Sequence, residues 1–207
     1  MPPYNSPLRE AQAAQTRRRI LDAAAELFGE LGYTGTSLAK IAERAGVSVE
    51  TVKLAGPKGA LLLAAFDQSF VGEELPSTIH ESDIGSALRA LPADEMLTEW
   101  VAFVSDANAR VARLWPRLHD AAAGDPEIAQ RLANLQANRR KDMCAAVSWL
   151  REEGRVQNDI DETTLGDSLS YIFAPEGYVR LVIECGWSME DYRAWVVRAI
   201  ERLILAP

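Results

Sequence analysis

Residues 37–52 read SLAKIAERAGVSVETV, and they are the most informative part of the sequence for its structure. Its first half places apolar residues at i, i+3, i+4 and i+7, on one face of an α-helix: Leu38, Ile41, Ala42 and Ala45. Ser37 can cap the start of this helix, and Gly46 allows a sharp turn directly after its end. The sequence therefore predicts a short amphipathic helix that ends in a tight turn.

A second short helix is predicted directly after the turn, with Ser48 as its cap. Val49 and Val52 are expected to face the first helix, and the polar residues between them to point away. Two short helices joined through a turn with Gly are typical of the helix-turn-helix, whose second helix lies in the DNA major groove. An ordinary hairpin of a helical core gives part of the same pattern, so the flanking sequence has to decide between the two.

A long first helix is predicted upstream, from about Ala11 to a C-cap at Gly32, after a Pro-rich polar arm that reaches about Arg9. The three arginines Arg17–Arg19 lie in its first turns. Such a run is often only a solvated helix face. Beside a DNA-reading unit, however, Arg17 and its neighbours are well placed to contact phosphates.

Charge is distributed unevenly along the chain, which carries a net charge of −8. Residues 1–66 hold eight Lys and Arg against six Asp and Glu, whereas the remainder holds fourteen against twenty-four. A general nucleic-acid binder is therefore not expected. The basic residues gather beside the turn motif, and the acidic remainder must serve another purpose.

Composition excludes several other classes of protein. No run approaches the ~20 apolar residues of a membrane span, and the first residues lack an apolar signal core. Cys144 and Cys185 are expected to be reduced thiols, and neither lies at metal-ligand spacing from a histidine. No nucleophile–base pair and no phosphate-binding Gly loop is visible. We therefore expect a cytoplasmic protein that is not an enzyme, with no cofactor, no metal and no membrane partner.

With its flanks, the stretch resembles a known family. Residues 20–52, ILDAAAELFGELGYTGTSLAKIAERAGVSVETV, followed by PKGALLLAAF at 57–66, are similar to the DNA-binding domain of the tetracycline-repressor (TetR) family of transcription regulators. The resemblance implies an all-α protein: an N-terminal three-helix helix-turn-helix domain plus a larger helical ligand-binding and dimerisation domain. We expect the first domain at residues 1–66, a linking helix to about residue 74, and the second domain at 75–207.

The resemblance also implies DNA contacts. Thr36 and the start of the second helix, at Ser37, are expected to meet the DNA backbone. The face that reads base edges is expected at Ser48, Val49, Glu50 and Thr51. Lys58, which begins the fourth helix, is expected to bind a phosphate.

Two features depart from the family pattern. Lys53 stands where members usually have an aromatic residue, and its charge could replace that residue's phosphate contact. The segment VKLAGPKGALL, residues 52–62, is also one residue shorter, running from Ala55 straight to Gly56-Pro57. The missing apolar residue is expected to loosen or rotate the third helix against the fourth.

Helices are predicted throughout the second domain, with stops at Gly124, Gly154 and Pro175 and a cap at Ser188. The family resemblance implies a pocket for a small-molecule effector, with these candidate lining residues: Trp100, Phe103, Trp115, His119, Met143 and Trp149. Plain core packing is the alternative for each. The last two helices are apolar over a wide face, and the resemblance implies that they form a homodimer. The alternative is that they only complete the monomer core.

These observations lead to one functional hypothesis and one alternative. The first is a ligand-responsive, sequence-specific transcription repressor that binds a palindromic operator on double-stranded DNA as a dimer. The alternative is a helical small-molecule-binding or interaction protein with an impaired DNA-binding head, which the shortened turn at Ala55-Gly56 motivates.

Overall fold

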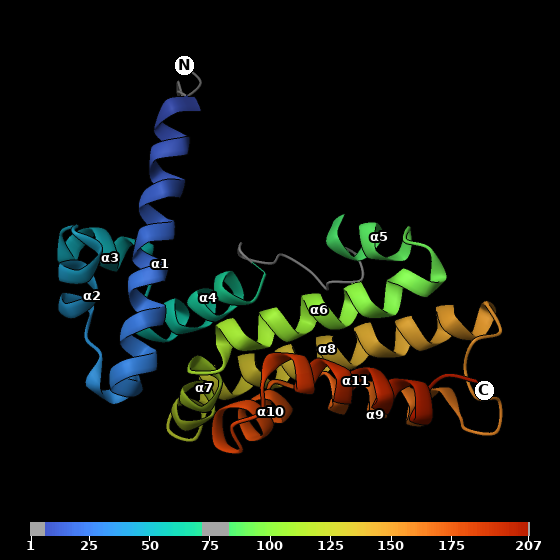
Figure 1. Cartoon of the computed structure of the whole chain (residues 1–207). Coiled ribbons are helices and arrows are strands. Elements are labelled where there is room, and N and C mark those ends of the chain that lie inside the picture. Colours follow the sequence, from blue (N-terminus) through green and yellow to red (C-terminus); the bar gives the residue numbers. More distant parts are fainter. Residues whose placement is uncertain (1–6, 72–82, 207) are drawn as a thin grey trace. The chain divides into compact units, whose positions relative to one another are not determined.

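The computed structural model describes residues 7–71 and 83–206, and its elements in these ranges are helices (Figure 1). In chain order they are α1 (Pro7–Gly35), α2 (Leu38–Ala45), α3 (Val49–Ala55), α4 (Lys58–Val71), α5 (Asp83–Arg89), α6 (Ala93–Val111), α7 (Leu114–Ala122), α8 (Pro126–Glu152), α9 (Glu162–Ile172), α10 (Pro175–Tyr178), the π-helix η1 (Val179–Glu184) and α11 (Met189–Leu203). Within the described ranges the β-type pairing is a single isolated bridge, between Val156 and Leu205. The predicted all-α class, with a helix-turn-helix ahead of a helical domain, is confirmed.

Contacts divide the chain into two compact units. Unit 1 comprises Met1–Glu74 and Arg113–Arg131, and unit 2 comprises Leu75–Ala112 and Leu132–Pro207. Unit 1 thus includes α7, which the sequence did not lead us to group with the first helices. The end of the linking helix at about 74 and the loop predicted from Leu75 lie outside the described residues, and the domain boundary stays a prediction.

In unit 1, α1 is the element against which α2, α4 and α7 pack. It begins at Pro7, inside the segment predicted as an arm, and Pro is well suited to the first helical position because its φ is already helical. Its backbone leaves helical geometry at Gly32 (φ 71°, ψ 176°), where the sequence predicted the end of the helix, and one further turn reaches Gly35.

Apolar side chains from each described helix of unit 1 are buried. They include Ile20, Leu21 and Phe28 of α1, Ile41 of α2, Val52 of α3, Leu61, Leu62 and Phe66 of α4, Trp115 and Leu118 of α7, and Ile128 at the start of α8. As the apolar spacing of residues 37–52 predicts, one face of each short helix, α2 and α3, is buried in the core of unit 1.

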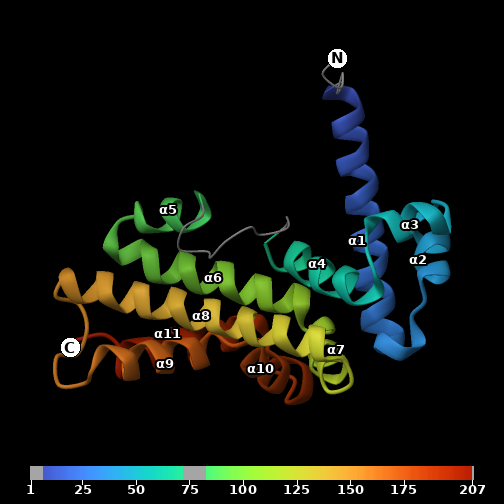
Figure 2. The same cartoon turned by 180° about the vertical axis from the view of Figure 1, so that it is seen from behind.

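Unit 2 has its own apolar core, to which α6, α8, α9 and α11 contribute (Figure 2). Asn108 is buried there, and its Nδ2 donates to the backbone oxygen of Phe173 at 3.1 Å. α8 and α9 approach each other closely, because a Cβ on Gly166 would lie only 2.5 Å from Sγ of Cys144. None of the described helices combines the length and the apolar character needed to cross a membrane.

Candidate functional site

The turn between α2 and α3 is built by caps at both helices. Ser37 Oγ accepts from the backbone N–H of Lys40 at the start of α2, at 3.3 Å. Gly46 ends α2 in the left-handed conformation (φ 64°, ψ 42°), which Gly adopts without a Cβ penalty. Ser48 Oγ accepts from the backbone N–H of Thr51 at 3.1 Å and starts α3. These contacts give the sharp change of direction that the sequence predicted.

The predicted reading face is accessible. Ser48, Val49 and Glu50 are exposed, and Thr51 is half-buried, with its hydroxyl 2.8 Å from Ser48 Oγ. Val52, the next residue, is fully buried and anchors α3 to unit 1. The two faces of α3 are therefore cleanly separated into an anchoring side and an open side.

Two charges and one apolar side chain complete the open side of α3. Lys53 is exposed, and its Nζ lies 3.5 Å from a carboxylate oxygen of Glu50. Leu54 is 83% exposed and was missed by the sequence reasoning. The sequence did indicate that Leu54 is exposed, because a residue two positions after Val52 on a helix cannot share the buried face of Val52. An exposed Leu on such a helix can contact the methyl group of thymine.

Arginines of α1 hold the carboxyl ends of both short helices. Arg17 Nη1 donates to the backbone oxygen of Ala55, the last residue of α3, at 2.9 Å. Arg19 Nη2 donates to the backbone oxygens of Ala45 and, at 3.3 Å, Gly46 at the end of α2. Cations at helix C-termini satisfy free carbonyls and offset the helix dipole. The run predicted to contact phosphates thus positions α2 and α3, while Arg18 between them is exposed.

Thr36, whose contact with the DNA backbone stays a prediction, has its side chain inside unit 1. It is 2% exposed, and its hydroxyl lies at hydrogen-bond distance from the backbone oxygens of Leu27 (3.0 Å) and Gly32 (2.9 Å). In this conformation the side chain is used to hold the kink at the end of α1. Ser37, the next residue, is exposed and remains available at the start of α2.

Lys58 also has contacts inside unit 1. Its Nζ donates to the backbone oxygens of Tyr33 (3.0 Å) and Thr36 (3.3 Å) and lies 4.2 Å from the centre of the Tyr33 ring. Burial, and secondarily the carboxylates of Asp125 and Glu127, raise the pKa of Tyr33. Through these contacts the half-buried Lys58 connects the start of α4 to the end of α1.

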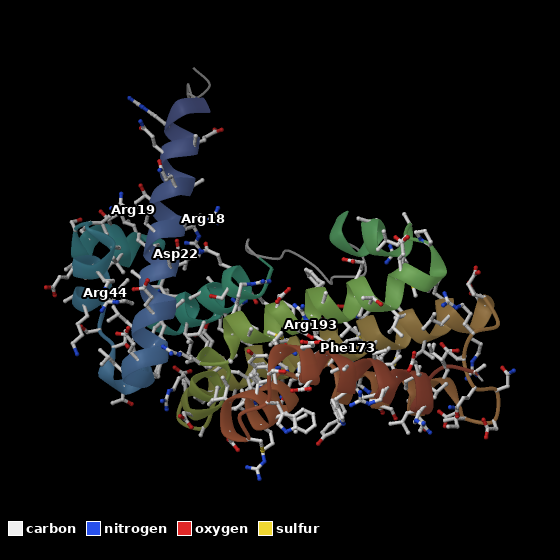
Figure 3. All side chains as sticks on the ribbon, viewed as in Figure 1. Arg18, Arg19, Asp22, Arg44, Phe173 and Arg193 are labelled. Atoms are coloured by element: carbon white, nitrogen blue, oxygen red, sulfur yellow. The ribbon has the colours of Figure 1, made fainter. Side chains whose placement is uncertain are left out.

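The shortened connection between α3 and α4 is accommodated by Gly56. Its backbone (φ 146°, ψ 169°) lies in a region open almost only to glycine, and its N–H donates to the backbone oxygens of Val52 and Lys53. Elsewhere in unit 1, Arg44 of α2 (Figure 3) donates a hydrogen bond to the carboxylate of Glu26 in α1 at 2.7 Å, and this bond raises the pKa of Arg44.

An apolar cavity lies within unit 2. Its cavity volume is about 70 Å³, with further space that is open to solvent. Three aromatic residues line it, Trp100 of α6, Trp149 of α8 and Phe173 after α9, together with aliphatic side chains of α6, α8, α9 and α11. The rings of Trp100 and Phe173 meet edge to face at 6.4 Å. Arg89 and Arg155 are the charged residues of the lining.

Of the six residues predicted to line an effector pocket, Trp100 and Trp149 line this cavity. Phe103 packs on the apolar core of unit 2, and Met143 is buried in it. Trp115 and His119 belong to α7 of unit 1, where Trp115 is buried against Phe66 at a ring distance of 5.5 Å. Periodicity identified the apolar faces, but it could not tell which side chains border open space.

Among the described residues, no group of three or more His, Cys, Asp or Glu is arranged to hold a metal ion. Cys144 and Cys185 are free thiols. The features of chemical interest in the described parts of the chain are therefore the open side of α3 and an apolar cavity with two arginines in its lining.

Residues 20–52 match the sequence model of a family described as bacterial regulatory proteins, tetR family. No curated protein matches the chain. Among solved structures, one described as a transcriptional regulator from Saccharomonospora viridis in complex with choline is 19% identical, with a TM-score of 0.70 over 93% of this chain and 99% of its own.

Two further structures are similar over nearly the whole chain. The fatty acid degradation regulator FadR from Bacillus halodurans is 19% identical, with a TM-score of 0.66 over 88% of this chain and 92% of its own. NalD, the secondary repressor of the MexAB-OprM multidrug efflux pump in Pseudomonas aeruginosa, is 17% identical, with a TM-score of 0.65 over 92% and 97%. At these identities the likeness shows the fold.

Proposed function

We propose that this chain acts as a repressor and that a small-molecule effector changes its affinity for a palindromic operator. The chain belongs to the TetR family of bacterial regulatory proteins and is a DNA-binding transcription regulator. The observation that carries the proposal is the open side of α3. Ser48, Val49 and Glu50 are exposed on a helix whose opposite side is anchored by the buried Val52. An α-helix presented in this way fits the major groove of DNA.

Contacts to the DNA backbone are proposed for residues around this helix. Ser37 at the start of α2 and Lys53 on α3 are exposed and can reach phosphates. Arg17, which hydrogen-bonds to a backbone oxygen of the protein, is assigned to positioning α3. Lys58, whose Nζ also donates to backbone oxygens of Tyr33 and Thr36, is proposed to bind a phosphate at the start of α4. Lys58 lies within the same small unit and adds positive charge near the duplex.

Dimerisation through the last helices is part of the proposal, because a palindromic operator presents two half-sites to two copies of one recognition helix. The exposed apolar side chains near the end of the chain support it. Ile183 of η1 is 60% exposed, and Leu203 of α11 is also exposed. Regulators of this family typically act as dimers, and repression is the activity named for the structurally similar NalD.

The effector is proposed to occupy the cavity of unit 2. Its walls include residues of α6 and α8, and the chain runs from α6 into α7 and then into α8. α7 in turn packs on α1 and α4 of unit 1. A change in the spacing of α6 and α8 would therefore be passed along the chain to the helices that hold α3. A coupling of ~1–3 kcal/mol would change operator affinity ~5–150-fold.

The second candidate is a helical small-molecule-binding or interaction protein with an impaired DNA-binding head. The shortened connection at Ala55-Gly56 is the observation that favours it. Against it stand the capped turn and the buried Val52, which keep α3 ordered in unit 1.

Selection of sequences from a random pool of duplex DNA by the full-length protein tests the proposal. We expect one palindromic sequence to be enriched. Thr51→Ala should change the preferred bases, whereas Lys58→Ala should weaken binding to all sequences alike and lower the salt slope by about one. Failure to enrich any sequence at any salt concentration favours the second candidate. Equal losses on every sequence for both variants would overturn the assigned roles.

A further inference from the structure

We infer that Leu54 of α3 is a specificity-determining residue that reads the methyl group of a thymine. Each half of the operator then contains at least one thymine whose methyl group contributes to binding. The inference rests on the proposed function, because it needs α3 in the major groove, and it adds the base and the chemical group that are recognised. Three observations carry it: the position of Leu54 on α3, the partners of its polar neighbours, and the local charge.

Leu54 lies on the side of α3 opposite to the buried anchor. Successive residues of an α-helix are rotated by about 100°, so a residue two positions from Val52 faces almost directly away from it. Leu54 is 83% exposed, the highest value among the large apolar side chains of the described residues, whereas Val52 is fully buried. Leu54 therefore adds almost nothing to the core of unit 1, and it projects from the side of α3 that is proposed to enter the groove.

The polar side chains of the open side already have partners close by. The hydroxyl oxygens of Ser48 and Thr51 lie 2.8 Å apart, and Lys53 Nζ lies 3.5 Å from a carboxylate oxygen of Glu50. These groups must share or exchange a hydrogen bond or an ion pair in order to bind a base edge. Leu54 gives up only its contact with water, so an apolar contact with a thymine methyl group competes with no interaction of the protein.

The surroundings of Leu54 fit a DNA duplex better than a protein partner. Residues 37–58 carry four Lys and Arg against two Glu, in a chain whose net charge is −8. On α3 the exposed apolar side chains are Leu54 and the 40% exposed Val49. A stable protein interface buries about 800 Å² on each partner, far more than two side chains offer. One leucine is enough to cover a methyl group, while the local positive charge attracts phosphates.

Deoxyuridine tests the contact, because it lacks the methyl group of thymidine but forms the same base pair. Each thymidine of the operator selected from the random pool is replaced in turn, in both half-sites at once. Binding of the full-length protein is measured by fluorescence anisotropy. At one or more positions we expect the replacement to weaken binding, by about 4-fold for each half-site.

Variants assign the effect to Leu54. Leu54→Ala should weaken operator binding about 10-fold, and at the identified position it should no longer distinguish thymidine from deoxyuridine. Loss of the methyl group also changes duplex shape, but that change acts on both proteins, so the difference between them reports the contact. Leu54→Met retains an apolar side chain and should keep the distinction. Leu31→Ala is the matched control, since Leu31 of α1 is also exposed and its truncation should change neither quantity.

A second pair of duplexes does not depend on an operator. Alternating dA-dT and dA-dU duplexes of equal length differ only in the methyl groups. At low salt the protein should bind the dA-dT duplex more tightly, and Leu54→Ala should bind the two duplexes equally. The melting temperature verifies that each variant is folded. If Leu54→Ala unfolds, the deoxyuridine scan and Leu54→Met still decide.

Three results would overturn the inference: no thymidine whose methyl group matters, a Leu54→Ala variant that still distinguishes thymidine from deoxyuridine, or a Leu54→Ala variant that changes only the dimer dissociation constant. A protein that selects an operator in which no methyl group matters supports the proposed function and contradicts this inference. A protein that selects no operator but prefers the dA-dT duplex through Leu54 does the reverse. Binding of no duplex at all overturns both.

Discussion

Arg17 of α1 donates a hydrogen bond from Nη1 to the backbone oxygen of Ala55, 2.9 Å away, at the end of the helix whose open side carries the candidate base-reading residues. The contact spans 38 positions of sequence and joins the longest helix of unit 1 to the shortest of its first four. The contact places the positive charge of Arg17 beside the last backbone carbonyls of α3.

Replacing Arg17 with Gln should lower the free energy of unfolding by about 1 kcal/mol, because the carbonyl end of α3 loses its charged donor. DNA binding should weaken on all sequences. Urea unfolding and binding at several salt concentrations measure the two effects. Arg18→Gln is the control: Arg18 is exposed, and its loss should leave stability nearly unchanged. If Arg17→Gln lowers the salt slope but not stability, Arg17 contacts a phosphate instead.

Glu50→Gln should raise affinity for unselected DNA several-fold, because it removes a carboxylate from the open side of α3, proposed to face DNA, and releases Lys53 from its 3.5 Å ion pair. Preference for the selected sequence should fall if Glu50 accepts a hydrogen bond from a cytosine amino group. Competition binding measures both quantities. Glu43→Gln on α2 removes the same charge at another exposed position of the head, and equal effects of both variants would reduce the role of Glu50 to net charge.

Ile183→Asp should raise the dimer dissociation constant at least about 10-fold, because it places a charge on the exposed apolar side of η1 proposed to meet a partner copy. Sedimentation velocity over a range of protein concentrations measures the change. Leu31→Asp, at an exposed apolar position of α1, should leave the oligomeric state unaltered. A dimer that survives Ile183→Asp with unchanged affinity would place the interface elsewhere.

Gly166→Ala should lower the free energy of unfolding by about 1–3 kcal/mol, because the new methyl group would lie 2.5 Å from Sγ and 3.0 Å from Cα of Cys144. Thermal and urea unfolding measure the loss. Gly177→Ala is the matched control, since its Cβ would have no heavy atom closer than 4.0 Å. Equal stability of the two variants would show that α8 and α9 can separate without cost.

Acid should weaken the start of α9. The Thr164 hydroxyl, followed by its backbone N–H, lowers the pKa of Asp161, the N-cap of that helix. Because the folded pKa is lowered, the carboxylate stabilises the fold above its unfolded pKa of about 3.9, and this contribution is lost as the pH falls through the folded pKa.

Asp161→Asn retains a capping oxygen but cannot titrate. The difference in unfolding free energy between the protein and this variant should therefore shrink as the pH is lowered from about 5 to about 2. Urea titrations at each pH measure the difference, and a difference independent of pH would contradict the role of the charge.

The sequence predicted the helix-turn-helix of unit 1 well, because the residues that determine its helix ends and its turn act locally. Ser37, Gly46 and Ser48 act on the backbone next to them, and the apolar spacing of α2 needs only one buried face. The same reasoning could not place Thr36 or Lys58. Their hydrogen-bond partners depend on how the kink at Gly32 brings the end of α1 toward α4.

In unit 2 the sequence predicted helices but not the open space between them. Trp100 and Trp149 border the cavity, whereas Met143, on the same helix as Trp149, is buried. Neither Arg89 nor Arg155 stood out, because a charged residue near a helix end is ordinarily a surface residue. The difference arises from tertiary packing, which periodicity does not encode.

Arg17 and Arg19 donate hydrogen bonds to main-chain oxygens at the ends of α3 and α2. Every amino acid carries such an oxygen. Side chains at 49, 50, 53 and 54 can therefore be exchanged without loss of these attachments. For protein engineering, the open side of α3 can therefore be redesigned. Libraries randomised at those four positions should yield folded proteins that prefer new target sequences.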